Sequence, residues 1–174
     1  MRAVESRYSA EHHMASVNLI FDNEQTAYLR ELSEKMNLDF GEFIPHATLI
    51  NVTEQDIPRL KLAATALPSL DKLVLDGVNF LPDEAGNCVW VELRVQKTSW
   101  MVEVRRKLLE MLDDIHPGLD IDGFRPHITL GIVEAGTLGD VDMSAIPRQL
   151  PVITKPRAAA CYNGMHGKVV EVVE

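Results

Sequence analysis

Two short stretches, Ile44-Pro45-His46-Ala47-Thr48-Leu49 and Arg125-Pro126-His127-Ile128-Thr129-Leu130-Gly131, set the architecture expected for this 174-residue chain. Both read Pro-His-x-Thr-Leu. On a strand, side chains at positions i and i+2 point to the same face. In each stretch the histidine and the threonine therefore project together, while the residue between them and the leucine turn to the opposite side. We expect two strands that each present an imidazole and a hydroxyl to one surface, with apolar neighbours behind them.

The residues around these stretches repeat one order of elements: strand, helix, motif-bearing strand. The first copy ends at residue 52, and the second lies between Asn87 and Val133. Alternation, helical spacing and turn residues predict the remaining elements. The predicted strands are Ala15–Phe21, Phe43–Val52, Asp71–Phe80, Asn87–Val95, Arg125–Val133, Val152–Tyr162 and Lys168–Val173. The predicted helices are Thr26–Met36 (with Asp22-Asn23 as its N-cap), Ile57–Leu67 and Ser99–Ile115 (ending at His116-Pro117-Gly118), with a helical turn at Val141–Ile146 and a hairpin turn at 163–167.

Mixed strands, hairpins and helices favour an α+β fold in which helices cover antiparallel sheets. The length fits a single domain, which we place at residues 14–174. The polar stretch 1–13 is predicted to be a flexible extension, since the folded pattern starts near Met14. If the two halves pack about a pseudo-twofold axis, their His–Thr pairs face each other across a groove.

Composition narrows the class of protein. Hydrophobic residues make up 46% of the chain and the net charge is −9. A protein that binds long nucleic acid through many phosphates needs a basic surface, so the acidic charge argues against this class. It does not exclude a small anionic ligand bound in a locally basic cleft. No apolar run approaches the roughly 18 residues of a membrane span. We expect a cytoplasmic, monomeric protein with no membrane partner, and two reduced cysteines, Cys88 and Cys161, with a disulfide as the less favoured alternative.

Two imidazoles and two hydroxyls suit in-line displacement at a phosphodiester. One neutral imidazole can take a proton from the attacking oxygen, and one imidazolium can protonate the leaving oxygen, because the reference pKa of histidine is about 6.5. The threonine hydroxyls can donate to the non-bridging phosphate oxygens. Zinc ligation by the two histidines is a less favoured alternative, because their partners are threonines and no Cys/His cluster accompanies them. The scheme needs no metal and no cofactor.

The two motifs resemble those of the 2H phosphoesterase superfamily, which includes 2′-5′ RNA ligase-like proteins and cyclic nucleotide phosphodiesterases. Residues 124–131 are especially close to the second motif of that family, while Ala47 stands where a bulkier apolar residue is common. The resemblance implies a bilobal α+β fold, with two pseudo-twofold-related antiparallel sheets, helices on the outer faces and a central groove. It also implies that His46 and His127 are the catalytic pair and that Thr48 and Thr129 bind phosphate.

The hypothesis is therefore a metal-independent phosphodiesterase (a phosphoric diester hydrolase) that acts on a small cyclic or 2′-5′-linked nucleotide or an RNA end. Ligation of RNA ends through a 2′-5′ bond is the nearest alternative, since the reverse reaction uses the same groups. A non-catalytic nucleotide-binding module is another. Two further residues are candidates for substrate binding: Tyr162, which could stack on a base although a core or rim position is favoured, and Arg125, for which a plain surface position is equally expected.

Overall fold

The structure is a computed structural model, and it describes residues 14–83, 85–115, 123–164 and 168–173. Three predictions fall outside these ranges. They concern the N-terminal extension, the residues at which the third helix ends, and residues 165–167 of the hairpin turn. In chain order the elements are β1 (Ala15–Ile20), α2 (Asn23–Lys35), β2 (His46–Val52), α3 (Ile57–Thr65), β3 (Lys72–Pro82), β4 (Cys88–Val95), α4 (Ser99–Met111), β5 (His127–Glu134), the 3-10 helices η2 (Ala135–Asp140) and η3 (Met143–Ala145), β6 (Val152–Thr154), β7 (Arg157–Asn163) and β8 (Val169–Val173).

Each α-helix begins at a side chain that caps it. The carboxylate of Asp22 accepts from the backbone N–H of Gln25 at 2.8 Å, and Asp56 does the same for the start of α3. Thr98 caps α4. Such caps satisfy N–H groups that have no partner within the helix. The predicted cap at Asp22-Asn23 is confirmed, and α2 begins three residues before the predicted Thr26.

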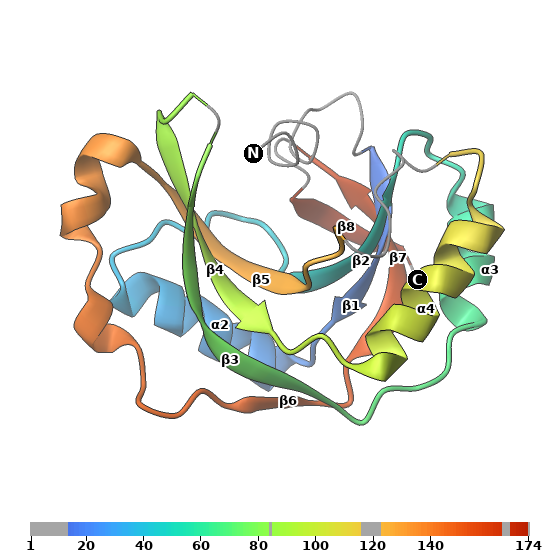
Figure 1. Cartoon of the computed structure of the whole chain (residues 1–174), viewed down its shortest axis with the longest axis horizontal. Helices are drawn as coiled ribbons and strands as arrows, with labels where there is room; N and C mark the ends of the chain where they lie inside the picture. The colour runs from blue at the N-terminus through green and yellow to red at the C-terminus, as the bar shows by residue number, and fades with distance from the viewer. Residues whose placement is uncertain (1–13, 84, 116–122, 165–167, 174) are drawn as a thin grey trace.

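The strands form one eight-stranded sheet in the order β6-β3-β4-β5-β2-β1-β7-β8, and the neighbouring strands are antiparallel. The α+β class is therefore confirmed, whereas a division into two separate sheets is not. Four strands lie on each side of the β5–β2 junction, and the sheet is strongly curved (Figure 1). The two motif strands are the central neighbours of this sheet, so the halves join where the motifs lie.

One predicted strand, Val152–Tyr162, is wrong as a single element. It is two strands, β6 and β7, which belong to opposite halves of the sheet: β6 pairs with β3 and β7 pairs with β1. The break falls at Lys155-Pro156. Lys155 has φ 47°, in the left-handed region, and Pro156 has no N–H to donate to a ladder.

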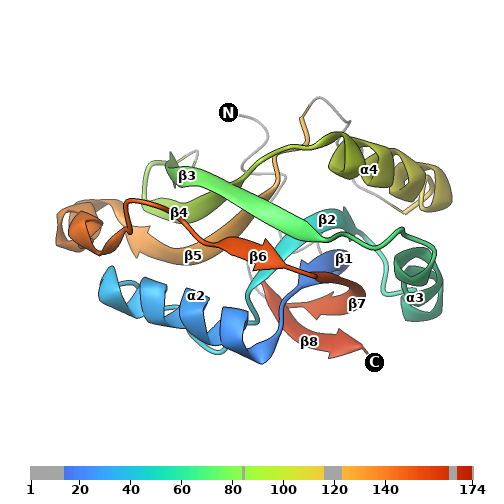
Figure 2. The same ribbon diagram turned by 90° about the horizontal axis from the view of Figure 1, so that it is seen from below.

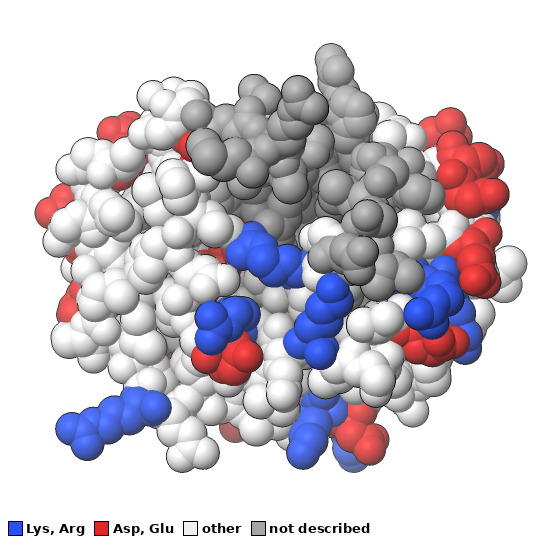
Figure 3. All heavy atoms as spheres, in the orientation of Figure 1, with Lys and Arg blue, Asp and Glu red and all other residues white. Residues whose placement is uncertain are grey.

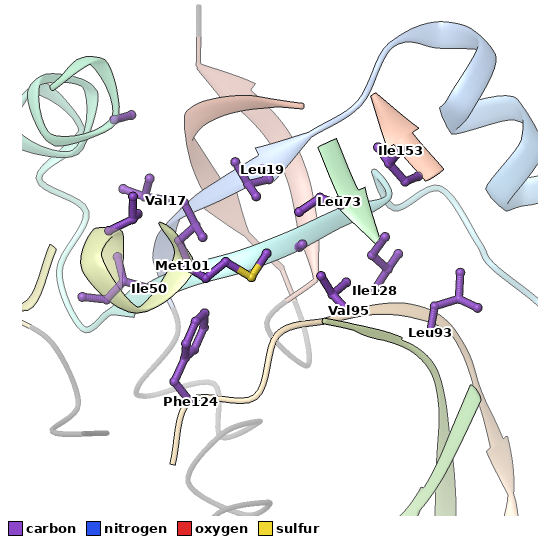
Figure 4. Packing of buried hydrophobic residues seen from close by; sticks show 14 of the residues in the cluster. Val17, Leu19, Ile50, Leu73, Leu93, Val95, Met101, Phe124, Ile128 and Ile153 are labelled. Atoms are coloured by element: carbon purple, nitrogen blue, oxygen red, sulfur yellow. The ribbon is translucent and has the colours of Figure 1, made fainter. Parts of the chain in front are cut away.

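The helix of each half packs against the motif strand of the other half. Helix α2 contacts β5, and α4 contacts β2. Seen from below, α2 lies toward the end of the molecule that holds β5, while α3 and α4 lie toward the opposite end (Figure 2). Buried residues from both halves form one core cluster, which includes Leu19 and Val17 of β1, Met101 of α4 and Ile128 of β5 (Figure 4). This crossed packing joins the two halves around one core.

Three other features of the described part of the chain bear on the sequence-based predictions. The thiols of Cys88 and Cys161 are free, and Cys161 is buried. In the ranges given above, no helix combines the length and the apolar character needed to cross a membrane. The predicted helical turn at Val141–Ile146 contains η3, and η2 precedes it without having been predicted.

Candidate active site

The site lies where the two motif strands meet. Ala47 of β2 pairs with Ile128 of β5, and both side chains are almost fully buried. Since the strands are antiparallel, this register places His46 opposite Thr129, and Thr48 opposite His127. Residues that lie opposite each other point to the same face, and diagonal neighbours on that face are about 7–8 Å apart. The two imidazoles are diagonal neighbours on this face.

The proline and the leucine of each motif limit this contact between the halves. Continuing the register places Pro45 opposite Leu130 and Pro126 opposite Leu49, and a proline has no N–H with which to extend the ladder. Each leucine is also an extra residue in the ladder with the strand on the other side. Leu49 is the extra residue between Thr48 and Ile50, where β2 pairs with β1, and Leu130 is the extra residue between Thr129 and Gly131, where β5 pairs with β4. Such β-bulges bend strands, and they are common beside active sites.

The carbonyls at these two bulges accept hydrogen bonds from the crossed helices. Ser33 of α2 donates its Oγ–H to the carbonyl of Leu130 at 2.8 Å, and Arg105 of α4 donates from Nη1 to that of Leu49 at 2.6 Å. Both donors are buried. The helix of each half thus fixes the bulge beside the His–Thr pair of the other half.

Both imidazoles are oriented by the same local contact. His46 Nδ1 lies 2.7 Å from the carbonyl oxygen of Ile44, and His127 Nδ1 lies 2.9 Å from that of Arg125. A carbonyl can only accept, so Nδ1 of each ring carries the proton and donates it. In a neutral ring the lone pair is then on Nε2, which is the atom left for proton transfer. The residue before each motif proline therefore sets the tautomer of the motif histidine.

His46 borders a small pocket. Thr129, from the other half of the sheet, lines the same pocket, as do Phe43 and Lys168. The Lys168 ammonium lies 4.2 Å from the centre of the Phe43 ring. The pocket therefore brings together an imidazole and a hydroxyl from different halves, with an aromatic ring and a cation beside them.

Burial lowers the pKa of His46 from its usual 6.5 to about 4. The positive charge of Lys168 adds to this effect, and the bond to the Ile44 carbonyl opposes it. The pKa of Lys168 is itself lowered by desolvation, with Asp39 acting in the opposite direction. At neutral pH His46 is a neutral imidazole with a free Nε2 lone pair, as a general base requires.

The lowered pKa of His46 predicts a pH dependence of folding stability. Between about pH 6.5 and pH 4 the unfolded chain binds a proton at this position and the folded chain does not, so stability falls as the pH falls through this window, by at most about 1.4 kcal/mol per pH unit for one proton. Urea unfolding at several pH values should show a flatter profile for His46→Asn than for the wild type. Equal slopes in the two proteins would contradict the neutral, buried imidazole.

His127 lies in a different environment, beside a buried glutamate of the neighbouring strand. The Nε2 atom of His127 is 3.3 Å from Oε1 of Glu92. Oε2 of Glu92 lies 3.1 Å from Nη2 of Arg125. The Glu92 side chain is 0% exposed and that of His127 is 11% exposed. Sequence reasoning missed Glu92, although a single acid within the apolar run Val89-Trp90-Val91-Glu92-Leu93 is itself a signal, because a buried charge needs a partner.

The other predicted site residues can now be placed. The structure brings His46, Thr48, His127 and Thr129 to one face, and Arg125 lies next to this group through Glu92. It does not bring Tyr162 there. Tyr162 pairs with Ala15 and packs against the main core, on the face of Leu19 and Ala47 and away from the imidazoles.

Charge near the site differs from the charge of the whole chain. The net charge is −9, yet Lys and Arg side chains gather around the middle of the face shown in Figure 3. Arg125 and Lys168, one on each side of the junction, are two cations with contacts to the site. Among the residues that the structure describes, no three His, Cys, Asp or Glu side chains come together as a metal ion would need.

Comparisons with known proteins agree with this fold. No protein-family model and no curated protein matches the chain. Among solved structures, TT0787 of Thermus thermophilus is similar at 21% identity and a TM-score of 0.55, with 92% of this chain and 94% of that chain covered. A solved phosphoesterase is similar at 14% identity and a TM-score of 0.51, covering 94% and 97%. These likenesses show a shared fold and nothing finer.

Proposed function

We propose that the chain is a 2H phosphoesterase that hydrolyses a small cyclic or 2′-5′-linked nucleotide phosphodiester without a metal ion. One observation carries the proposal: the pairing of Ala47 with Ile128 sets two His–Thr pairs side by side on a single face. The fold shared with a solved phosphoesterase supports it. Arg125 and Lys168 supply local positive charge, which suits an anionic substrate.

The geometry supports an in-line reaction. The phosphorus atom lies between the two imidazoles, with its non-bridging oxygens at the hydroxyls of Thr48 and Thr129. One imidazole takes a proton from water through Nε2 as the water oxygen bonds to phosphorus. The other donates a proton from its Nε2 to the ribose oxygen that leaves. One P–O bond forms and one breaks, and the two protons are returned through solvent, so no metal or cofactor takes part.

The test is incubation of the protein with a panel of 2′,3′-cyclic nucleotides and 2′-5′-linked dinucleotides in EDTA, with the products separated by chromatography. We expect at least one substrate to be hydrolysed, at a rate that EDTA does not change. Loss of turnover in EDTA would favour a metal site. Joining of cyclic-phosphate and 5′-hydroxyl RNA ends without hydrolysis would favour the ligase. Thermal stabilisation by nucleotides with no substrate consumed would favour a binding module.

A further inference from the structure

The two imidazoles of the site have unlike neighbours. His127 faces the carboxylate of Glu92, from the adjacent strand β4. For His46, the charged neighbour found within the described residues is a cation, Lys168, and its other polar partner is the carbonyl of Ile44. The pseudo-twofold arrangement of the motifs therefore does not extend to their electrostatics, and the two histidines need not have interchangeable roles.

The contact between His127 and Glu92 requires a proton. Nδ1 of His127 donates to the carbonyl of Arg125, so Nε2 of the neutral ring would point a lone pair at Oε1 of Glu92. Two acceptors 3.3 Å apart in a buried site repel each other, unless one of them is protonated. The other carboxylate oxygen, Oε2, lies 3.1 Å from the guanidinium of Arg125, which can only donate, so the Glu92 carboxylate serves as an acceptor on both sides. The proton therefore belongs on Nε2 of His127.

We propose that Glu92 is a positioning residue that holds His127 as the imidazolium, so that His127 is the general acid and His46 the general base. This assignment rests on the phosphodiester chemistry proposed above. His46 Nε2 accepts the proton of the attacking water. The leaving oxygen takes the place of Oε1 of Glu92 as the acceptor at His127 Nε2 and receives the proton of that atom. His46 then releases its proton to solvent and His127 takes one up, drawn by the carboxylate of Glu92, so one water is consumed per bond cleaved.

Two other charged groups among the described residues lie near His127, and both are themselves paired. Arg94 lies opposite His127 on β4, but its guanidinium pairs with Asp76 of β3 at 2.5 Å. Arg125 is paired with Glu92 itself. Thr129 shares the face and is neutral.

The experiment is an NMR titration of the histidine ring signals, with no substrate present. In the wild type we expect His127 to titrate at higher pH than His46. In Glu92→Gln the titration midpoint of His127 should fall by about one pH unit or more, while that of His46 stays in place. Glu103→Gln, the same chemical change on the exposed face of α4, should leave both midpoints unchanged. Signals are assigned with His46→Asn and His127→Asn.

The pH–rate profile gives a second readout on any substrate that is turned over. The alkaline limb of kcat/KM should move to lower pH in Glu92→Gln, and the acid limb should not move. A wild type in which His46 titrates above His127, or a folded Glu92→Gln with an unshifted His127, overturns the inference. If Glu92→Gln does not fold, the wild-type order alone decides. Failure of the proposed function is seen separately, as absence of turnover with the titrations as expected.

Discussion

Replacing either His46 or His127 by alanine is expected to lower kcat/KM by at least ~100-fold on the best substrate of the panel. Each ring supplies one proton transfer, and alanine can supply neither. The fold should persist, because both rings lie on the face opposite the main core and neither forms part of the Ala47–Ile128 contact. The rates are measured by chromatography under saturating and subsaturating substrate, with circular dichroism to confirm folding.

The double variant distinguishes a working pair from two independent contributions. Groups that act as a unit are strongly non-additive, so His46→Ala/His127→Ala should lose little more than the worse single variant. Thr137→Ala is a matched control at an exposed threonine just beyond β5, and we expect it to keep wild-type turnover. A single histidine variant with wild-type turnover would remove that histidine from the reaction.

Shortening Ile128 to alanine is expected to lower the free energy of unfolding by about 2–5 kcal/mol. Ile128 is 0% exposed, and it lies in one cluster with Val95 and Leu73 (Figure 4). A large-to-small change there removes buried apolar surface and leaves a cavity at the point where the two halves of the sheet join. The measurement is urea unfolding at a fixed pH, with the midpoint and the slope both fitted.

Ile132→Ala serves as the matched control for this prediction. It lies on the same strand and loses the same atoms, but its side chain is only partly buried. We expect a smaller loss of stability there, because part of the deleted surface is already in water. Equal losses at the two positions would mean that the junction has no special role in stability.

Local patterns in the sequence predicted much of the fold. The alternation on strands, the helical spacing of apolar residues and the cap at the start of α2 depend on residues near one another in the chain, so most of the elements could be placed within a few residues. The His-x-Thr pairs were found in the same way, because the two-residue period of a strand fixes which side chains share a face. The internal repeat of the motif then predicted that both pairs belong to one site.

The pairing of strands that are distant in the sequence could not be predicted from local patterns. The break of β6 from β7 depends on Lys155 and Pro156, but the switch of partner from β3 to β1 depends on where those strands lie. The position of Tyr162 likewise follows from its register with β1. The presence of a buried acid, Glu92, in an apolar strand is explained only by its contacts with His127 and Arg125, which are distant in sequence.

Residues close together in the chain were enough to predict which side chains of each motif face together. The packed chain was needed to show that the two halves share one sheet, that each helix crosses to the other half to hold a bulge, and that one imidazole meets a carboxylate while the other meets a lysine. The physical reason is that backbone geometry is set over a few residues. Burial and the field at a titrating group are instead set by whatever the whole chain packs around it.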